Sequence, residues 1–118
     1  MWKLSKRLTS ERRTISSASV GTNKLQSKRV RPGRLLKTKI VVIENKTNNY
    51  SKLRVGIYDR GLFYNFFEEM LPLAGQLYWT VDEMILAEGQ QVQAELQGCT
   101  AGDSLEMFLH GMWVFESI

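Results

Sequence analysis

The chain has 118 residues, of which 43% are hydrophobic and 24% charged, ordinary values for one globular domain. Its charge is unevenly spread, because residues 1–39 hold twelve Lys and Arg against one acid, Glu11, whereas residues 40–118 hold four basic and eleven acidic residues. The single cysteine excludes a disulfide scaffold, and one cysteine with one histidine is too few for a zinc finger. The lack of an apolar run of about 18 residues excludes a transmembrane protein, and the length excludes a multidomain enzyme.

The first part of the chain, residues 1–35, predicts an extended, intrinsically disordered basic arm. It has few apolar residues and no sustained period, and Gly21 and Pro32 interrupt any long helix. Such a segment buries too little apolar area to offset the entropy of ordering, so we expect it to order only on a partner. The composition of residues 1–25 also fits a mitochondrial transit peptide, but the basic character continues to Lys39, which favours the arm.

Residues 36–118 predict a folded domain, because apolar and polar residues alternate there with the period of half-buried strands. Turn-forming residues separate about seven short segments of this kind. The expected strands are 36–44, 50–58, 62–67, 76–82, 91–97, 104–110 and 112–115. We therefore expect an all-β fold, an antiparallel β-sandwich. A domain of about 80 residues is marginal as a monomer, so self-association would help it.

Only a few side chains could carry catalysis. His110 could act as a general base beside Ser104, with Asp103 or Glu106 to orient it. Glu106 and His110, however, lie four residues apart on one expected strand, about 13 Å along a regular strand, which is too far for direct pairing. We interpret His110 as an exposed or interface residue.

The acidic pairs and the cysteine also lack a catalytic pattern. Neighbours such as Glu68 and Glu69, or Asp82 and Glu83, point to opposite faces of a strand, which does not suit an acid/base pair. Cys99 lies in a Gly-rich loop without a basic neighbour to stabilise a thiolate. We expect no enzymatic activity, no cofactor and no metal site.

Several aromatic side chains fall on faces opposite the inferred core. A subunit interface is the favoured explanation, because interfaces are rich in aromatic residues. A sugar-binding platform that uses Trp79, Tyr78 or Trp113 is one alternative, and a bulge that shifts the alternation is another. The side chains expected at an oligomer interface are Phe63, Phe67, Tyr78, Phe108 and Trp113, with Phe115 as the alternative to Trp113.

The basic arm has two functional interpretations. It could neutralise the phosphates of a nucleic acid, or it could lie along a neighbouring subunit. The acidic remainder of the chain favours the second, since opposite charges steer copies together. The side chains expected to bind a partner are Arg12, Arg13, Lys28, Arg29, Arg31 and Arg34 as electrostatic contacts, and Trp2, Leu4 and Leu8 as apolar anchors.

Four blocks within residues 36–118 carry a resemblance to a known family. They are KIVVIENKTNN, LRVGIYDRG, a mid-chain PLAG followed by an alternating strand, and the closing block MILAEGQQVQAELQG with SLEMFLHGMWVFE. Within the closing block, the positions that match the family's pattern are Leu86, Gly89, Val92, Ala94 and Gly111. In these blocks the chain resembles small β-sandwich structural proteins of tailed bacteriophage virions.

The resemblance implies a repeated, non-enzymatic virion component with no catalytic residues to carry over. We expect a capsid-associated decoration or cement protein that self-associates and locks neighbouring subunits with its N-terminal arm, gaining avidity from the lattice. Its expected partners are further copies of itself and other virion proteins, above all the major capsid protein, with no membrane contact. The alternatives are a neck or tail component, or a nucleic-acid-binding protein that uses the basic arm.

Overall fold

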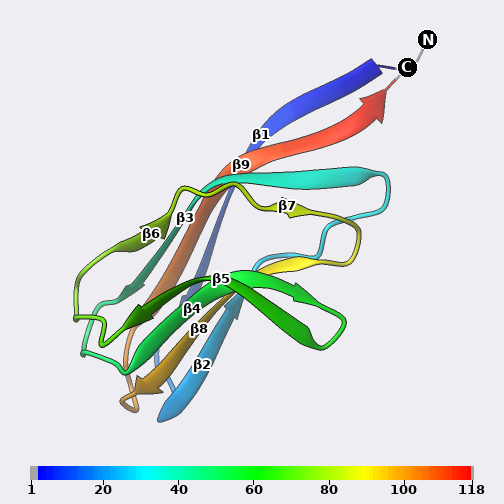
Figure 1. Cartoon of the computed structure of the whole chain (residues 1–118). Helices are drawn as coiled ribbons and strands as arrows, with labels where there is room; N and C mark the ends of the chain where they lie inside the picture. Colours follow the sequence, from blue (N-terminus) through cyan, green and yellow to red (C-terminus); the bar gives the residue numbers. More distant parts are fainter. Residues whose placement is uncertain (1–2, 118) are drawn as a thin grey trace.

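The computed structural model describes residues 3–117 and contains two antiparallel β-sheets packed against each other (Figure 1). Sheet A has the strand order β1-β9-β3-β6, with β7 also pairing with β3, and sheet B has the order β2-β8-β4-β5. The strands are β1 (Lys3–Ile15), β2 (Gly21–Gln26), β3 (Arg34–Asn45), β4 (Lys52–Asp59), β5 (Leu62–Met70), β6 (Tyr78–Thr80), β7 (Ile85–Leu86), β8 (Gln91–Cys99) and β9 (Leu105–Ser117). The all-β antiparallel sandwich is confirmed.

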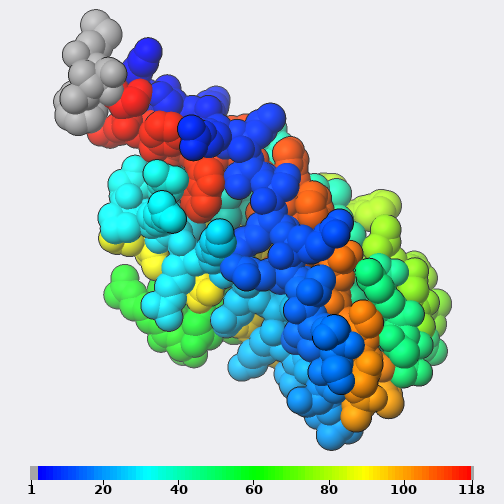
Figure 2. Space-filling model, turned by 180° about the vertical axis from the view of Figure 1, so that it is seen from behind, coloured from blue at the N-terminus to red at the C-terminus, as the bar shows by residue number. Residues whose placement is uncertain are grey.

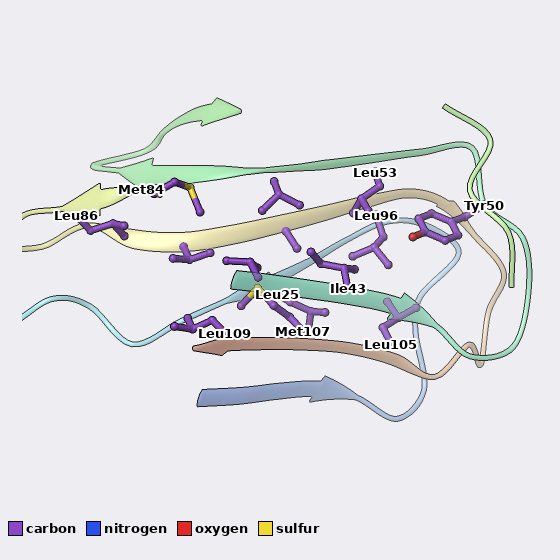
Figure 3. Packing of buried hydrophobic residues seen from close by; sticks show 14 of the residues in the cluster. Leu25, Ile43, Tyr50, Leu53, Met84, Leu86, Leu96, Leu105, Met107 and Leu109 are labelled. Atoms are coloured by element: carbon purple, nitrogen blue, oxygen red, sulfur yellow. The ribbon is translucent and has the colours of Figure 1, made fainter. Parts of the chain in front are cut away.

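The hydrophobic core lies between the two sheets (Figure 3). Burial alternates along the second half of β3, the first half of β4 and the first half of β9, and β8 buries Val92, Ala94 and Leu96 on its core face. Side chains of this cluster with no exposed surface include Val41, Leu53, Leu86, Val92, Leu96 and Leu105. Each large side chain buried in this way stabilises the fold by about 1.5–3 kcal/mol.

The disordered arm expected over residues 1–35 is not confirmed. Strand β1 pairs with β9 without a register shift, from Lys3 opposite Ser117 to Ile15 opposite Leu105, and β2 pairs with β8. Ala18, Leu25 and Val30 of this segment also belong to the core, so the expected domain boundary at residue 35 has no counterpart in residues 3–117. The physical reason is that β1 and β2 hydrogen-bond to β9 and β8, which would otherwise be sheet edges.

The molecule is elongated, with extents of 54 × 25 × 22 Å. In Figure 1, β1 and the second half of β9 run side by side to one end of the molecule, with the paired residues Lys3 and Ser117 at the far end. We call residues 3–8 and 112–117 the projecting ribbon.

Register shifts occur in β2, β3 and β5, and those in β3 and β5 bear on the faces of the aromatic side chains. In β3 the register shifts between Thr38 and Ile40, opposite Gly111 of β9. A Cβ atom on Gly111 would meet the carbonyl oxygen of Lys37, so the close approach of the two backbones requires glycine there. In β5 a second shift makes Phe66 the extra residue, because Val55 pairs with Phe67 and Gly56 with Asn65.

Candidate functional site

Sheet A has an outer face, turned away from sheet B, on which apolar side chains lie among polar and charged ones. Side chains directly opposite each other on paired strands share a face, so the register defines this surface. Its apolar members, here called the outer apolar face, are Leu4, Leu8, Leu35, Ile40, Val42, Trp79, Ile85, Phe108, Met112 and Val114.

Two rows of cross-strand neighbours hold five of the ten residues of the outer apolar face. One row runs from Phe108 through Val42 to Trp79, across β9, β3 and β6, and another contains Leu8 opposite Met112. Leu8 is 67% exposed and Trp79 56% exposed, although both are large apolar side chains. Large exposed apolar side chains on one face of a sheet are typical of a protein contact.

Of the five side chains expected at an oligomer interface, only Phe108 lies on the outer apolar face. Phe63 is half-buried on β5, opposite Tyr58, on the side of sheet B that faces away from the core. Phe67, Tyr78 and Trp113 pack against the core instead, so their expected orientation was wrong.

Tyr78 lies on the short strand β6 and points toward the core, opposite to the expected orientation. Thr80 pairs with buried Val41 and Tyr78 pairs with buried Ile43, which places Tyr78 inward and Trp79 outward. The hydroxyl of Tyr78 accepts a hydrogen bond from the backbone N–H of Leu73 at 2.8 Å. A shift of one residue turns every side chain of a strand to the other face. Of the three aromatic residues named for the alternative sugar platform, Tyr78 and Trp113 pack against the core and Trp79 is exposed.

The bulges in β5 and β3 explain why Phe67 and Trp113 face the core. On β5, the extra residue Phe66 returns Phe67 to the face of Val55, which is buried. On β9, the register with β1 is continuous, and the bulge near Gly111 lies in β3. Trp113 therefore stays on the same face as the buried Leu109.

The residues expected to bind a partner divide into three groups. Leu4 and Leu8 are exposed on the outer apolar face. Arg12 and Arg13 are paired within the chain, with Glu106 at 3.4 Å and with Glu11 at 2.9 Å. The remaining four, which gather around a pocket beside Trp113, are Lys28, Arg29, Arg31 and Arg34. Trp2 lies outside the described residues.

The residues weighed for catalysis are not brought together. Ser104 directly precedes β9 and His110 lies within it, six residues later, which corresponds to about 20 Å on a regular strand. The Nδ1 atom of His110 is 2.9 Å from the hydroxyl of Ser10, and Glu106 is paired with Arg12 and Lys46. Residues 3–117 hold no group of three His, Cys, Asp or Glu side chains placed for a metal.

Asp103 is instead part of a buried polar network. Its carboxylate accepts hydrogen bonds from Asn45 Nδ2 at 2.9 Å, from Asn48 Nδ2 at 2.6 Å and from the backbone N–H of Thr100 at 2.9 Å. Burial by itself would raise the pKa of Asp103, but these hydrogen bonds lower it below its usual value. Asp103 thus ties the end of β3 to the β8–β9 loop as an ionised group.

Cys99 is a buried thiol at the end of β8. Burial raises the pKa of this thiol, since the thiolate would lose its hydration. A nucleophilic cysteine requires a lowered pKa and access to solvent. The site therefore does not favour thiol chemistry.

No helix in residues 3–117 is long and apolar enough to cross a membrane.

Comparisons with known proteins add little. No family model matches the chain, and no curated protein matches it. Among solved structures, it is similar to dimeric latent PorU from Porphyromonas gingivalis, with a TM-score of 0.41 and 8% identity, over 94% of this chain and 13% of that one. The chain thus spans about an eighth of that protein, and a likeness this weak supports no functional inference.

Sequence reasoning missed the outer apolar face and the pocket. The sequence did hold one indication of the outer apolar face, because Leu4 and Leu8 lie at positions that share one face of a strand. The low hydrophobicity of the segment outweighed that pattern.

Proposed function

We propose that the protein is a non-enzymatic structural protein that self-associates through its outer apolar face. The observation that carries this proposal is the row formed by Phe108, Val42 and Trp79, which lies on the surface of sheet A rather than in the core. Covering a large apolar side chain stabilises an association by about 1.5–3 kcal/mol before the costs of binding. A second copy of the chain is the favoured partner, because each copy would then cover the outer apolar face of the other.

The resemblance to β-sandwich proteins of tailed bacteriophages supports placing this assembly in a virion. There the protein would be a capsid-associated decoration or cement protein, in contact with the major capsid protein. The projecting ribbon takes the part expected of the disordered arm, since it forms one end of the molecule and presents Leu4 and Leu8. Weak contacts of this kind gain strength when many copies are held on one lattice.

Light scattering on three purified proteins tests the self-association. We expect a defined oligomer for the wild type, a monomer for Trp79→Lys, and an unchanged oligomer for the control Val20→Lys. Val20 is 77% exposed but lies in the β1–β2 connection, away from the outer apolar face. A monomeric wild type at tens of micromolar, or an oligomer that tolerates Trp79→Lys, would overturn the proposal.

The placement in a virion needs a separate test. Mass spectrometry of purified phage particles whose genome encodes the chain should detect it at a copy number proportional to capsid subunits. A copy number near that of a neck or tail ring would favour the alternative position. Its absence from particles would exclude a virion role and leave the self-association untouched.

A further inference from the structure

A pocket of about 250 Å³ lies on the molecule between β1, the β2–β3 connection and the second half of β9. Figure 2 shows these three segments together, with the connection (cyan) beside β1 (blue) and the end of β9 (red). The side chains that matter here are Glu11 of β1, Lys28, Arg29, Arg31 and Arg34 of the connection and the start of β3, and Trp113 of β9.

The pocket has an excess of positive charge. Within residues 3–117, none of the four cationic side chains lies within 4.0 Å of a carboxylate, in contrast to Arg12, Arg13 and Lys46. The one acid, Glu11, is already satisfied, because it accepts the backbone N–H of Lys28 at 2.9 Å and pairs with Arg13. Four cationic residues therefore line one pocket without an ion-pair partner.

The backbone that presents these cations is held in place. Ser27 and Val30 are both 2% exposed. The N–H of Ser27 bonds to Val92 O at 2.9 Å, and the N–H of Val30 bonds to Gln90 O at 3.0 Å. Lys28 is fixed from the other side by Glu11. The backbone N–H groups of Ser27, Lys28 and Val30 are thus all hydrogen-bonded. A segment held in this way is preorganised for a ligand, which reduces the entropy lost on binding.

The wall of the pocket orients Arg34. Its guanidinium carbon lies 5.4 Å from the centre of the Trp113 ring, a cation–π distance. This contact leaves the N–H groups at the edge of the guanidinium available for an acceptor. Thr9 and Ser10 line the pocket as well and add hydroxyl groups.

We propose that this basic pocket binds a phosphate group. Three arginine residues and one lysine residue that line the pocket supply several charged donors. A tetrahedral phosphate has enough oxygens to accept from all of them, whereas a carboxylate has two oxygens and is satisfied by one arginine. The source can be free inorganic phosphate or pyrophosphate, or the phosphodiester of a nucleic acid, since all share this chemistry.

Nuclear magnetic resonance titration tests the proposal independently of self-association. The indole N–H signal of Trp113, assigned with Trp113→Phe, is followed while inorganic pyrophosphate or a ten-nucleotide single-stranded oligothymidylate is added. The variants are the double substitution Arg29→Ser with Arg31→Ser, both on exposed positions, and the control Arg60→Ser in the β4–β5 turn. The control removes a charge of the same type from a residue that does not line the pocket.

We expect a saturable shift for the wild type and Arg60→Ser, and an apparent affinity at least about tenfold weaker for the double variant, because two charged hydrogen-bond donors are lost. Tighter binding of the oligonucleotide than of pyrophosphate would assign the phosphate to a nucleic acid, and equal or weaker binding would assign it to a free anion. No shift with either probe, an equal shift in the double variant, or a response to hexaglutamate alone would overturn the proposal.

Discussion

Arg34 and Trp113 are in contact across two neighbouring strands of sheet A, with the guanidinium carbon 5.4 Å from the ring centre. Arg34 also lies 5.7 Å from the ring of Phe115, its direct partner in the register. This pair joins the start of β3 to the second half of β9, where the projecting ribbon leaves the sandwich.

The first prediction concerns the stability of that junction. We expect Arg34→Ala to lower the free energy of unfolding by about 1 kcal/mol, because a cation–π contact and the packing of the aliphatic stem are lost. Urea denaturation followed by circular dichroism measures this effect. Arg31→Ala is the matched control and should be neutral, and equal effects of the two substitutions would contradict the role of the contact.

The second prediction concerns Gly111, beside which β3 passes closely. We expect Gly111→Ala to destabilise the fold by about 2 kcal/mol or more, because the new Cβ would meet the carbonyl oxygen of Lys37 and force the strands apart. Thermal unfolding compares it with His110→Ala, whose side chain points to the outer face. A Gly111→Ala variant as stable as the wild type would show that the bulge in β3 can yield.

The third prediction follows from the lowered pKa of Asp103. The folded carboxyl group ionises at lower pH than the unfolded one, so its contribution to stability is complete above the unfolded value of about 3.9 and is lost as the pH falls through the folded value. The free energy of unfolding should therefore decline below about pH 4. In Asp103→Asn that decline should be shallower, with a loss of about 1–3 kcal/mol at neutral pH.

Denaturation at a series of pH values checks this prediction. The substitution Asp82→Asn serves as the control, since Asp82 is exposed and should leave the acid decline unchanged. A wild type and an Asp103→Asn variant with parallel profiles would contradict the assigned role of the carboxylate.

The fourth prediction concerns Cys99, which is 3% exposed. Its buried thiol has a raised pKa, so we expect slow reaction with an aromatic disulfide reagent at pH 8 in the folded protein. In denaturant the same thiol should react at the rate of a free cysteine. Rapid reaction of the folded protein would indicate an open or thiolate-stabilising site.

The sandwich region was predictable because its strands alternate strongly, as in β8, where Val92, Ala94 and Leu96 are buried. The face of Phe108 was predictable for the same reason. Tyr78, Phe67 and Trp113 were assigned to the wrong face, since a three-residue strand and the bulges at Phe66 and in β3 are set by pairing with distant strands. Local alternation does not encode such shifts.

By itself the sequence determined the all-β fold, the sandwich and the uneven distribution of charge, because these depend on local period and composition. The tertiary structure alone decided that residues 3–15 form a strand, since β1 is held by backbone hydrogen bonds to β9, which begins about ninety residues later. It also decided that Leu8 meets Met112 and that Arg31 and Arg34 share a pocket with Trp113. Contacts between such distant positions arise from chain topology, which composition does not specify.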